Sequence, residues 1–278
     1  MFSDLHQLIF VHIPKCAGMS VEAALGGLPG AQAHEQHLSG AQYRSYYPDK
    51  WAHFHAFTVV RHPLHRAWSY VRFIRRFDPV WRQHLRHVPT SRLLRDTLFS
   101  TNVLVQRPAH VMLTGEEELL RFESLAEDWA RFAEPRGLPR TLPHRNRTEG
   151  PKEAPDALAP YLVAAFFPED HTRFGYAFPE GEPTELSDLG TLRWAELHAW
   201  TRRLPGRFTQ DDHEAAVAWL RDWRARLPLD AWRSALDRWT AARPPPFAAG
   251  RQMQKWAEAL HDDANQALGK PLWEPWSA

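Results

Sequence analysis

The sequence predicts an α/β fold, a P-loop-like parallel sheet flanked by helices, with a helical C-terminal extension. A pattern of strand, loop and helix occurs twice in the first part of the chain, at residues 7–25 and 56–77. Such alternation is typical of a parallel sheet covered by helices. After about residue 180 the apolar residues follow helical spacing instead. We therefore expect two domains, residues 1–180 with the sheet and residues 181–278 with helices only.

The first strand is expected within residues 7–13, QLIFVHI. This run is apolar and partly β-branched, as in a buried strand, and Pro14 ends it. A helix is expected to start at Ser20 and to reach Leu25. The loop between them therefore lies at the carboxyl end of a strand, where α/β proteins bind ligands.

The second strand is expected at residues 56–60, AFTVV, and the sequence RHP separates it from a helix over residues 64–77. Arginines are frequent from Arg61 to Arg95, whereas Asp78 is the single acidic residue of that stretch. This charge suits an anionic ligand. A solvated helix face is the alternative interpretation of the arginines.

Later elements are a third strand at residues 119–122 and a helix at residues 157–167. Most of the 13 tryptophans lie between Trp194 and Trp276. Thr209 and Asp212 have the spacing of a capping box at the start of a helix. The tryptophans could bind a sugar or a lipid, but aromatic residues at helical spacing usually form core, which is what we expect here.

Composition limits the class of protein. The 278 residues are 44% hydrophobic with a net charge of +1, and no stretch reaches the ~18 apolar residues that a membrane span needs. Cys16 is the single cysteine, so an internal disulfide is excluded. The first strand begins too early to leave room for a signal sequence. We expect a cytoplasmic location.

The first loop, HIPKCAGMS, differs from a nucleoside-triphosphatase P-loop because Lys15 comes early, directly after the strand. The residues of the loop nevertheless favour the binding of an anion. Gly18 lets backbone N–H groups approach a phosphate or sulfate, the helix from Ser20 directs its positive end there, and Lys15 and the Ser20 hydroxyl add donors. An ordinary strand-to-helix turn is the alternative. A thiol-phosphatase role for Cys16 would need an arginine closing the loop, so we expect Cys16 to be a small packed residue.

The second loop carries Arg61 at the strand end and Ser69 on the following helix, which together could hold one phosphate from two sides. HIPKCAGMS resembles the 5′-phosphosulfate loop of sulfotransferases that use 3′-phosphoadenosine 5′-phosphosulfate (PAPS), and RHPLHRAWSY resembles their 3′-phosphate motif. The carbohydrate and heparan-sulfate-type branch (sulfotransferase family 2) is the most similar. The resemblance continues through PHRNRT, FESLAEDW and DHTRFGY and covers roughly residues 7–178. Met19 departs from the usual small polar residue.

The resemblance implies transfer of a sulfonyl group from PAPS to a hydroxyl acceptor, which leaves adenosine 3′,5′-bisphosphate (PAP) and requires no metal. Lys15 would stabilise charge on the leaving oxygen. By position, the implied cofactor-binding residues are Lys15, Cys16, Ala17, Gly18, Met19 and Ser20 for the phosphosulfate, Arg61 and Ser69 for the 3′-phosphate, and Asn146 and Thr148 in a closing loop.

A histidine is the expected base, because imidazole titrates near neutral pH. The resembling enzymes carry an active-site histidine in a stretch like HLT, which HLSG at His37 matches, and His34 is the second candidate. His53 and His55 point to one face before a strand, but nothing joins them as a further metal ligand, so we expect no metal site. The role of Glu123, which follows the third strand, stays open.

Two other functions remain possible. A P-loop kinase-like phosphotransferase would need Mg²⁺ and a carboxylate at a second strand end, where TVVRHP has arginine and histidine. A non-catalytic nucleotide- or glycan-binding protein would share the phosphate loop. A nucleic-acid partner and a membrane span are not expected. The acceptor, a glycan or a small metabolite, and the oligomeric state are not defined by the sequence.

Overall fold

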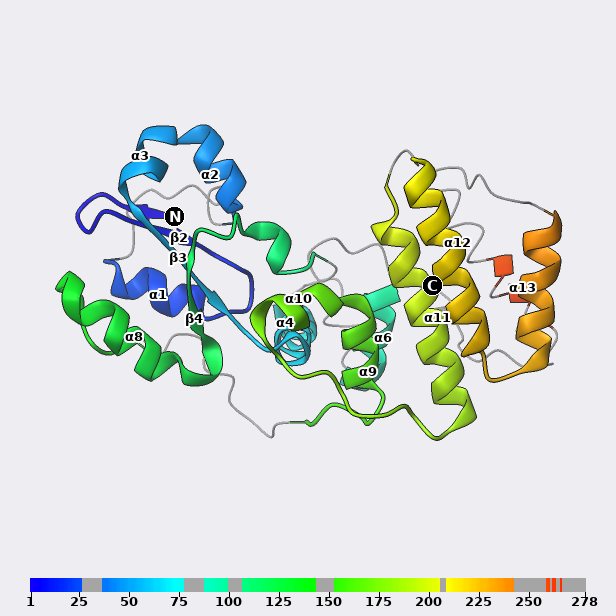
Figure 1. The fold of residues 1–278 in the computed structure, drawn as a ribbon. Helices are drawn as coiled ribbons and strands as arrows, with labels where there is room; N and C mark the ends of the chain where they lie inside the picture. The colour runs from blue at the N-terminus through cyan, green and yellow to red at the C-terminus, as the bar shows by residue number, and fades with distance from the viewer. Residues whose placement is uncertain are drawn as a thin grey trace. The chain divides into compact units, whose positions relative to one another are not determined.

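The computed structural model describes residues 1–26, 37–77, 88–99, 107–143, 153–205, 209–242, 259–260, 262–263 and 266. The chain divides into two compact units, whose elements are labelled in Figure 1. The first comprises Met1–Thr97, Thr101–Pro155 and Phe167–Phe178, and the second comprises Leu98–Ser100, Asp156–Phe166 and Pro179–Ala278. The second unit thus takes in a segment that the sequence prediction assigned to the first domain. The functional division at residue 180 stays a prediction.

A four-stranded sheet forms the centre of the first unit. Its strands are β1 (Phe2–Ser3), β2 (Leu8–Val11), β3 (His55–Val60) and β4 (Glu118–Arg121), in the order β1-β2-β3-β4. β1 is antiparallel to β2, whereas β2, β3 and β4 are parallel to one another. The carboxyl ends of the three parallel strands therefore share one edge. This mostly parallel sheet confirms the α/β class.

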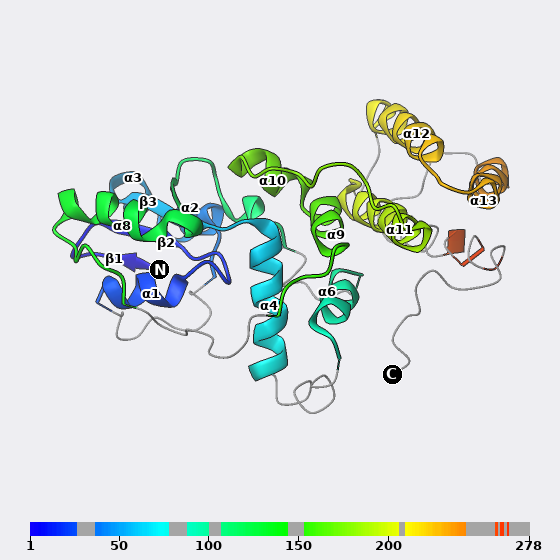
Figure 2. The same ribbon diagram turned by 90° about the horizontal axis from the view of Figure 1, so that it is seen from below.

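The helices of the first unit are α1 (Gly18–Ala24), α2 (Gly40–Tyr46), α3 (Pro48–His53), α4 (Pro63–Phe77), α8 (Leu125–Ala133) and α10 (Pro168–Phe174). Within the described residues, the short 3₁₀ turns η2 (His110–Met112), η3 (Phe122–Ser124) and η4 (Glu134–Arg136) also belong to this unit. α6 (Thr90–Phe99) contributes residues to both units. Figure 2 shows α4 turning away from the sheet after β3. Loop and helix thus follow each of the first two parallel strands, as predicted.

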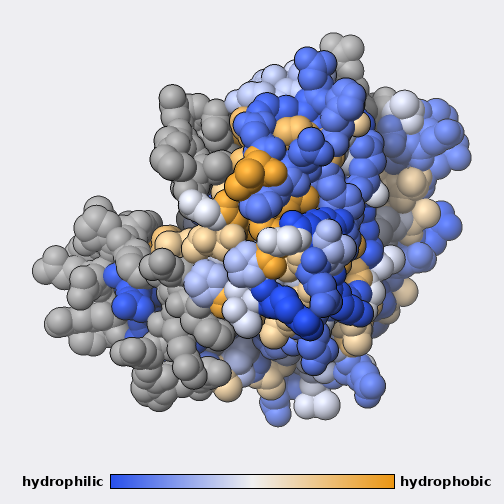
Figure 3. Space-filling view, turned by 90° about the vertical axis from the view of Figure 1, so that its left-hand side faces the viewer, coloured by the Kyte–Doolittle hydropathy of each residue, from blue (hydrophilic) through white to orange (hydrophobic). Residues whose placement is uncertain are grey.

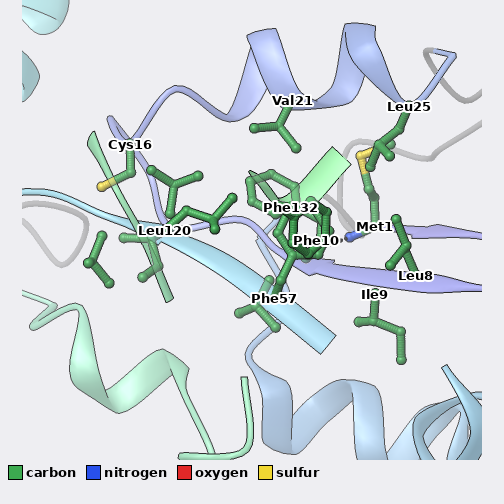
Figure 4. Packing of buried hydrophobic residues seen from close by; sticks show 14 of the residues in the cluster. Met1, Leu8, Ile9, Phe10, Cys16, Val21, Leu25, Phe57, Leu120 and Phe132 are labelled. Atoms are coloured by element: carbon green, nitrogen blue, oxygen red, sulfur yellow. Dashed lines mark hydrogen bonds between the residues drawn. The ribbon is translucent and has the colours of Figure 1, made fainter. Parts of the chain in front are cut away.

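Aromatic rings hold the sheet to the helix α8. Phe10 and Phe57 face each other across β2 and β3, with ring centroids 5.1 Å apart, and Phe132 of α8 lies 4.3 Å from Phe57. Val21 and Leu25 belong to the same buried cluster (Figure 4). Burial of this apolar surface is the main stabilising contribution to such a core. It fixes the strands, and with them the loops at their carboxyl ends.

The predicted strands fall within a residue or two of the observed ones. The helix expected at residues 157–167 is α9 (Ala159–Phe166), which lies in the second unit. β1 was not predicted, because a two-residue strand carries no detectable periodicity.

The second unit is helical in the residues that the structure describes, with α9, α11 (Leu186–Arg203), α12 (Gln210–Ala225) and α13 (Asp230–Ala242). The capping box of Thr209 and Asp212 is confirmed. Trp200 of α11 stacks on Trp219 of α12 with centroids 4.3 Å apart. Most of the described C-terminal tryptophans are buried, which confirms the core prediction for Trp194, Trp200, Trp223 and Trp232.

None of the helices in the described ranges combines the length and the apolar character that crossing a bilayer requires. On the face drawn in Figure 3, most described residues are hydrophilic and the apolar ones form a small group among them.

Candidate functional site

Three loops meet at the sheet edge where the parallel strands end. β2 leads into the loop that begins at His12, β3 into Arg61 and β4 into Phe122. The guanidinium of Arg61 donates a hydrogen bond to the backbone oxygen of Lys15 at 3.1 Å. The same guanidinium lies 3.9 Å from the centroid of the Phe122 ring. Arg61 therefore contacts both neighbouring loops, and the structure brings the two predicted motifs together.

Lys15 is a half-buried cation with unusual backbone geometry. Its φ angle is 70°, in a region that few non-glycine residues adopt, and its Nζ lies 4.0 Å from the centroid of the Phe73 ring on α4. Burial and then the charge of Arg61 lower the pKa of Lys15 to about 8. Most of the lysine is thus protonated at neutral pH. Within the described ranges no carboxylate forms an ion pair with Lys15 or Arg61, so the edge holds two cations that an anion could neutralise.

The loop after β2 has two residues with a positive φ angle, because Ala17 has a φ of 59° in addition to Lys15. Successive backbone N–H groups in such a conformation form concavities that suit anions. The carbonyl of Ala17 accepts hydrogen bonds from Ser20 at 2.9 Å and Val21 at 3.2 Å, so α1 begins at Gly18, two residues earlier than predicted. Since the Ser20 N–H is used inside α1, a contact of Ser20 with an anion would come from its hydroxyl. The Met19 side chain is 51% exposed.

Gly18 has a packing role that the sequence did not indicate. A Cβ atom built on Gly18 would lie 1.8 Å from Nε2 of His12, far inside contact distance. The His12 ring therefore occupies the space that a side chain at position 18 would need. Glycine is required here by its neighbour, in addition to the anion approach that we expected from it.

Cys16 is a packed residue, as predicted. Its side chain is buried in the core cluster (Figure 4), with Sγ 3.8 Å from the carbonyl of Pro14. Burial raises the pKa of the Cys16 thiol to about 12. A thiol of this kind is not ionised at neutral pH and is a poor nucleophile. The backbone N–H of Cys16 donates to the carbonyl of Ile13 at 3.3 Å, so neither its side chain nor its N–H is a ready donor for an anion in this loop.

Arg61 and Ser69 lie on consecutive elements but do not bond to each other. Arg61 follows β3, and Ser69 is a half-buried residue of α4. Within the described residues Arg61 bonds to Lys15, and its buried Nε has no hydrogen-bond partner. This donor is unused within the described residues, but it is buried, so an anion from solvent would contact the terminal N–H groups of the guanidinium instead. The prediction that Arg61 and Ser69 hold one phosphate stays a prediction.

His37 is an exposed residue beside the loop that follows β2. Its Nδ1 lies 3.4 Å from the backbone oxygen of His12, and the two imidazole rings are 4.6 Å apart. Partial burial and then the charge of His12 lower the pKa of His37. A neutral, accessible imidazole can accept a proton at neutral pH. His34 lies outside the described residues.

Glu123 acquires a structural role. Its Oε1 accepts a hydrogen bond from the backbone N–H of His62 at 2.8 Å, and its Oε2 accepts one from the hydroxyl of Tyr176 at 2.9 Å. The bond from His62 ties the end of β4 to the end of β3, and the bond from Tyr176 adds the segment that follows α10. Burial opposes ionisation, but the bond from His62 and the other donors outweigh it and lower the pKa of Glu123.

The remaining predicted residues are the closing-loop pair Asn146 and Thr148 and the histidines His53 and His55. Asn146 and Thr148 lie outside the described residues. His55 pairs with Glu118 at 2.7 Å, whereas Nδ1 of His53 lies 2.7 Å from the backbone oxygen of Asp49, so the two histidines have separate partners. Across the described ranges the structure has no cluster of three potential metal ligands.

His12 and its partner Glu22 are functional candidates that sequence reasoning missed. The signal available was the position of His12, directly after a strand and inside the motif HIPKCAGMS.

No protein-family model matches this chain, and comparisons with curated proteins and with solved structures found no match either. The described edge combines two cations, a loop with two residues of positive φ and a neutral imidazole. Together these groups can bind a polyanion and accept a proton.

Proposed function

We propose that this protein is a PAPS-dependent sulfotransferase with a P-loop-like site, which moves a sulfonyl group to a hydroxyl of a glycan or a small metabolite. The contact between Arg61 and Lys15 carries the proposal. It brings together two loops that resemble the 3′-phosphate and 5′-phosphosulfate motifs of sulfotransferases. Because the single cysteine permits no internal disulfide, the proposal places the reaction in the cytoplasm.

The charges of the site fit a nucleotide with anionic groups at two positions. A half-buried lysine without a carboxylate partner in the described residues is destabilised, as its lowered pKa indicates, and an anion would relieve this. Arg61 has a buried Nε without a partner in the same part of the chain. Lys15 would hold the 5′-phosphosulfate, and Arg61 with Ser69 would hold the 3′-phosphate.

Lys15 would be the principal electrostatic catalyst. In the reaction the bond between sulfur and the bridging oxygen breaks, its electron pair stays on that oxygen, and a bond forms between sulfur and the acceptor oxygen. Negative charge therefore grows on the bridging oxygen in the transition state. A fixed ammonium beside that oxygen stabilises the transition state more than the ground state, which is what raises the rate.

His37 would take the acceptor proton. A histidine whose pKa lies below the working pH is unprotonated and ready to act as a base. The exposure of His37 makes it accessible to an acceptor arriving from solvent.

The two alternatives are less well supported. A kinase-like phosphotransferase would use a carboxylate at a neighbouring strand end to hold Mg²⁺. Glu123 occupies that position, but both of its oxygens already accept hydrogen bonds from the protein. A non-catalytic nucleotide- or glycan-binding protein would use the same cations, so turnover has to separate this alternative from the proposal.

The test combines binding with turnover. Isothermal titration calorimetry with PAP measures the nucleotide site, and ³⁵S-labelled PAPS with a panel of sugars, phenols and alcohols measures transfer. We expect PAP to bind and at least one acceptor to become labelled. Lys15→Met keeps the packing on Phe73 but removes the charge, and should lower the rate about 100-fold or more.

Lys50→Met is the matched control, because Nζ of Lys50 lies 3.9 Å from the ring centroid of Phe2 in a similar cation–π contact. This variant should keep both PAP binding and turnover. Tight PAP binding without transfer to any acceptor would favour the binding protein, and absence of PAP binding by the wild type would reject the proposal.

A further inference from the structure

His12 lies at the carboxyl end of β2 as a buried polar residue, only 7% exposed. Its Nδ1 is 2.9 Å from Oε1 of Glu22, which projects from α1 on the far side of the phosphate loop. The close contact with His12 is the main cause of the lowered pKa of Glu22, so the carboxylate is ionised at neutral pH. The pair therefore links the end of β2 to α1 across the loop between them.

The ring of His12 fits against Gly18, the first residue of α1. Three of its ring atoms, Nε2, Cδ2 and Cε1, would lie 1.8 to 2.3 Å from a Cβ atom at position 18. The ring thus lies between two neighbours, with Nδ1 at 2.9 Å from the carboxylate of Glu22 and the opposite edge against Gly18. The position of the loop backbone between Lys15 and Gly18 therefore depends on the His12 ring.

The backbone of His12 reaches a second candidate residue. Its carbonyl oxygen lies 3.4 Å from Nδ1 of His37, and a carbonyl can only accept, so this bond requires the proton of His37 on Nδ1. The lone pair is then on Nε2. That tautomer is the one in which the more distal ring nitrogen is available to accept a proton.

We propose that His12, held by Glu22, is the positioning residue that ties the phosphate loop to His37. The pair sets the place of the loop through Gly18 and selects the tautomer of His37 through the His12 carbonyl. What these groups position rests on the proposed function, whereas the contacts themselves do not. One residue would thus couple the geometry of the sulfonyl donor to the protonation state of the base.

The contact with Gly18 is tested by a double-mutant cycle of Gly18→Ala and His12→Ser. Gly18→Ala alone forces the new methyl group into the His12 ring and should weaken PAP binding at least about tenfold. In the His12→Ser background, where the ring is absent, the same change should cost much less. An equal cost in both backgrounds would overturn this half of the proposal, since Gly18 would then serve the anion alone.

The link to His37 is tested by ¹⁵N NMR of the imidazole rings, without nucleotide. We expect His37 as the Nδ1–H tautomer in the wild type and in Glu22→Gln, which keeps an acceptor for His12. Glu22→Ala should shift His37 to the averaged signals of an unrestrained imidazole. Glu118→Ala is the matched control, because it removes the partner of His55 at the amino ends of β3 and β4.

An unchanged His37 signal in Glu22→Ala, or an Nε2–H tautomer in the wild type, would overturn the coupling. These spectra need no ligand, so they separate the two proposals. If the wild type fails to bind PAP while the His37 signals respond as expected, the proposed function fails and the positioning unit stands. If PAP binds and PAPS is turned over while His37 does not respond to Glu22→Ala, the proposed function stands and the positioning unit fails.

Discussion

The guanidinium of Arg61 donates to the backbone oxygen of Lys15 at 3.1 Å, so the end of β3 holds the loop that follows β2. In the proposed function, this one arginine would contribute to binding at both ends of the nucleotide. It supports the loop that would hold the phosphosulfate, and its terminal N–H groups would be the donors for a second anion, because its unpartnered Nε is buried. Arg61 should therefore control selectivity among nucleotides as well as affinity.

Arg61→Lys should reduce the preference for PAP over adenosine 5′-monophosphate by about 10- to 100-fold, the effect of losing one hydrogen bond to a charged group. Lysine keeps the charge but lacks the planar array of donors that can serve Lys15 and a phosphate together. Calorimetric titration with both nucleotides measures the ratio.

Arg136→Lys provides the control for this substitution. Its guanidinium also lies over a phenylalanine ring, 4.0 Å from the centroid of Phe132, and also donates to a backbone oxygen, at 2.8 Å. The nucleotide preference should not change in that variant. Equal losses in the two variants would mean that Arg61 acts through general stability.

The lowered pKa of Lys15 predicts an unusual pH dependence of stability. The folded-state pKa is about 8, against 10.5 in the unfolded chain. Between these values the unfolded state binds more protons, so this residue makes the free energy of unfolding rise with pH. Below pH 8 the charged lysine destabilises the ligand-free protein. Lys15→Met should therefore be more stable than the wild type at pH 7, and the difference should shrink toward pH 10.

Urea denaturation of the two proteins from pH 7 to pH 10 measures this difference. The contributions of the other titratable groups to the free energy of unfolding cancel in the comparison, because both proteins contain them. PAP should stabilise the wild type at pH 7 more than it stabilises Lys15→Met, because the variant keeps Arg61 and Ser69 but lacks one cation. A wild type that is more stable than the variant at pH 7 without ligand would show that the contact with Phe73 outweighs the cost of burying the charge.

The sequence predicted the elements that position the site better than the contacts within it. Strands β2 and β3 are short apolar runs ended by prolines, and local patterns of this kind suffice to place two loops at one sheet edge. The pairing of Arg61 with Lys15 joins residues that are distant in the chain, so no local pattern could show it. The same limit applied to Glu123 and Tyr176.

The role of His12 was missed for a different reason. His12 follows the apolar run of the first strand, where it extends the strand pattern, and Glu22 occurs where a solvated helix residue is expected. Whether Glu22 can reach His12 depends on the residue at which α1 begins. The helix begins at Gly18, two residues before the predicted start. Helix boundaries are the least reliable part of a sequence-based interpretation because caps without side-chain bonds, such as Ala17, leave no signature.

Asp170 should be the most important buried carboxylate of the first unit. It is 1% exposed, accepts hydrogen bonds from the backbone of Ala109 at 2.7 Å and of His110 at 2.9 Å, and lies 3.6 Å from buried Arg66. Asp170→Asn would leave Arg66 as a buried charge without its partner, which typically costs about 3 to 5 kcal/mol. Chemical denaturation measures the loss.

The exposed pair of Asp237 with Arg224 gives the comparison, because Asp237→Asn should cost under about 1 kcal/mol. Burial opposes ionisation of Asp170, but the bond from His110 and the charge of Arg66 outweigh it and lower its pKa. The stabilisation should therefore be present above the unfolded pKa and be lost as the pH falls through the folded one. A similar small effect of both substitutions would contradict a structural role for Asp170.

Cys16 should be chemically silent in the folded protein. Burial raises its thiol pKa to about 12 and removes Sγ from solvent, so iodoacetamide at pH 8 should modify Cys16 only after unfolding. Cys16→Ala removes one buried atom and should retain PAP binding and turnover, because the side chain of this residue packs in the core cluster. Mass spectrometry of the native and the urea-unfolded protein measures the modification. Rapid labelling of the native protein, blocked by PAP, would instead place the thiol in the site and revive a nucleophilic mechanism.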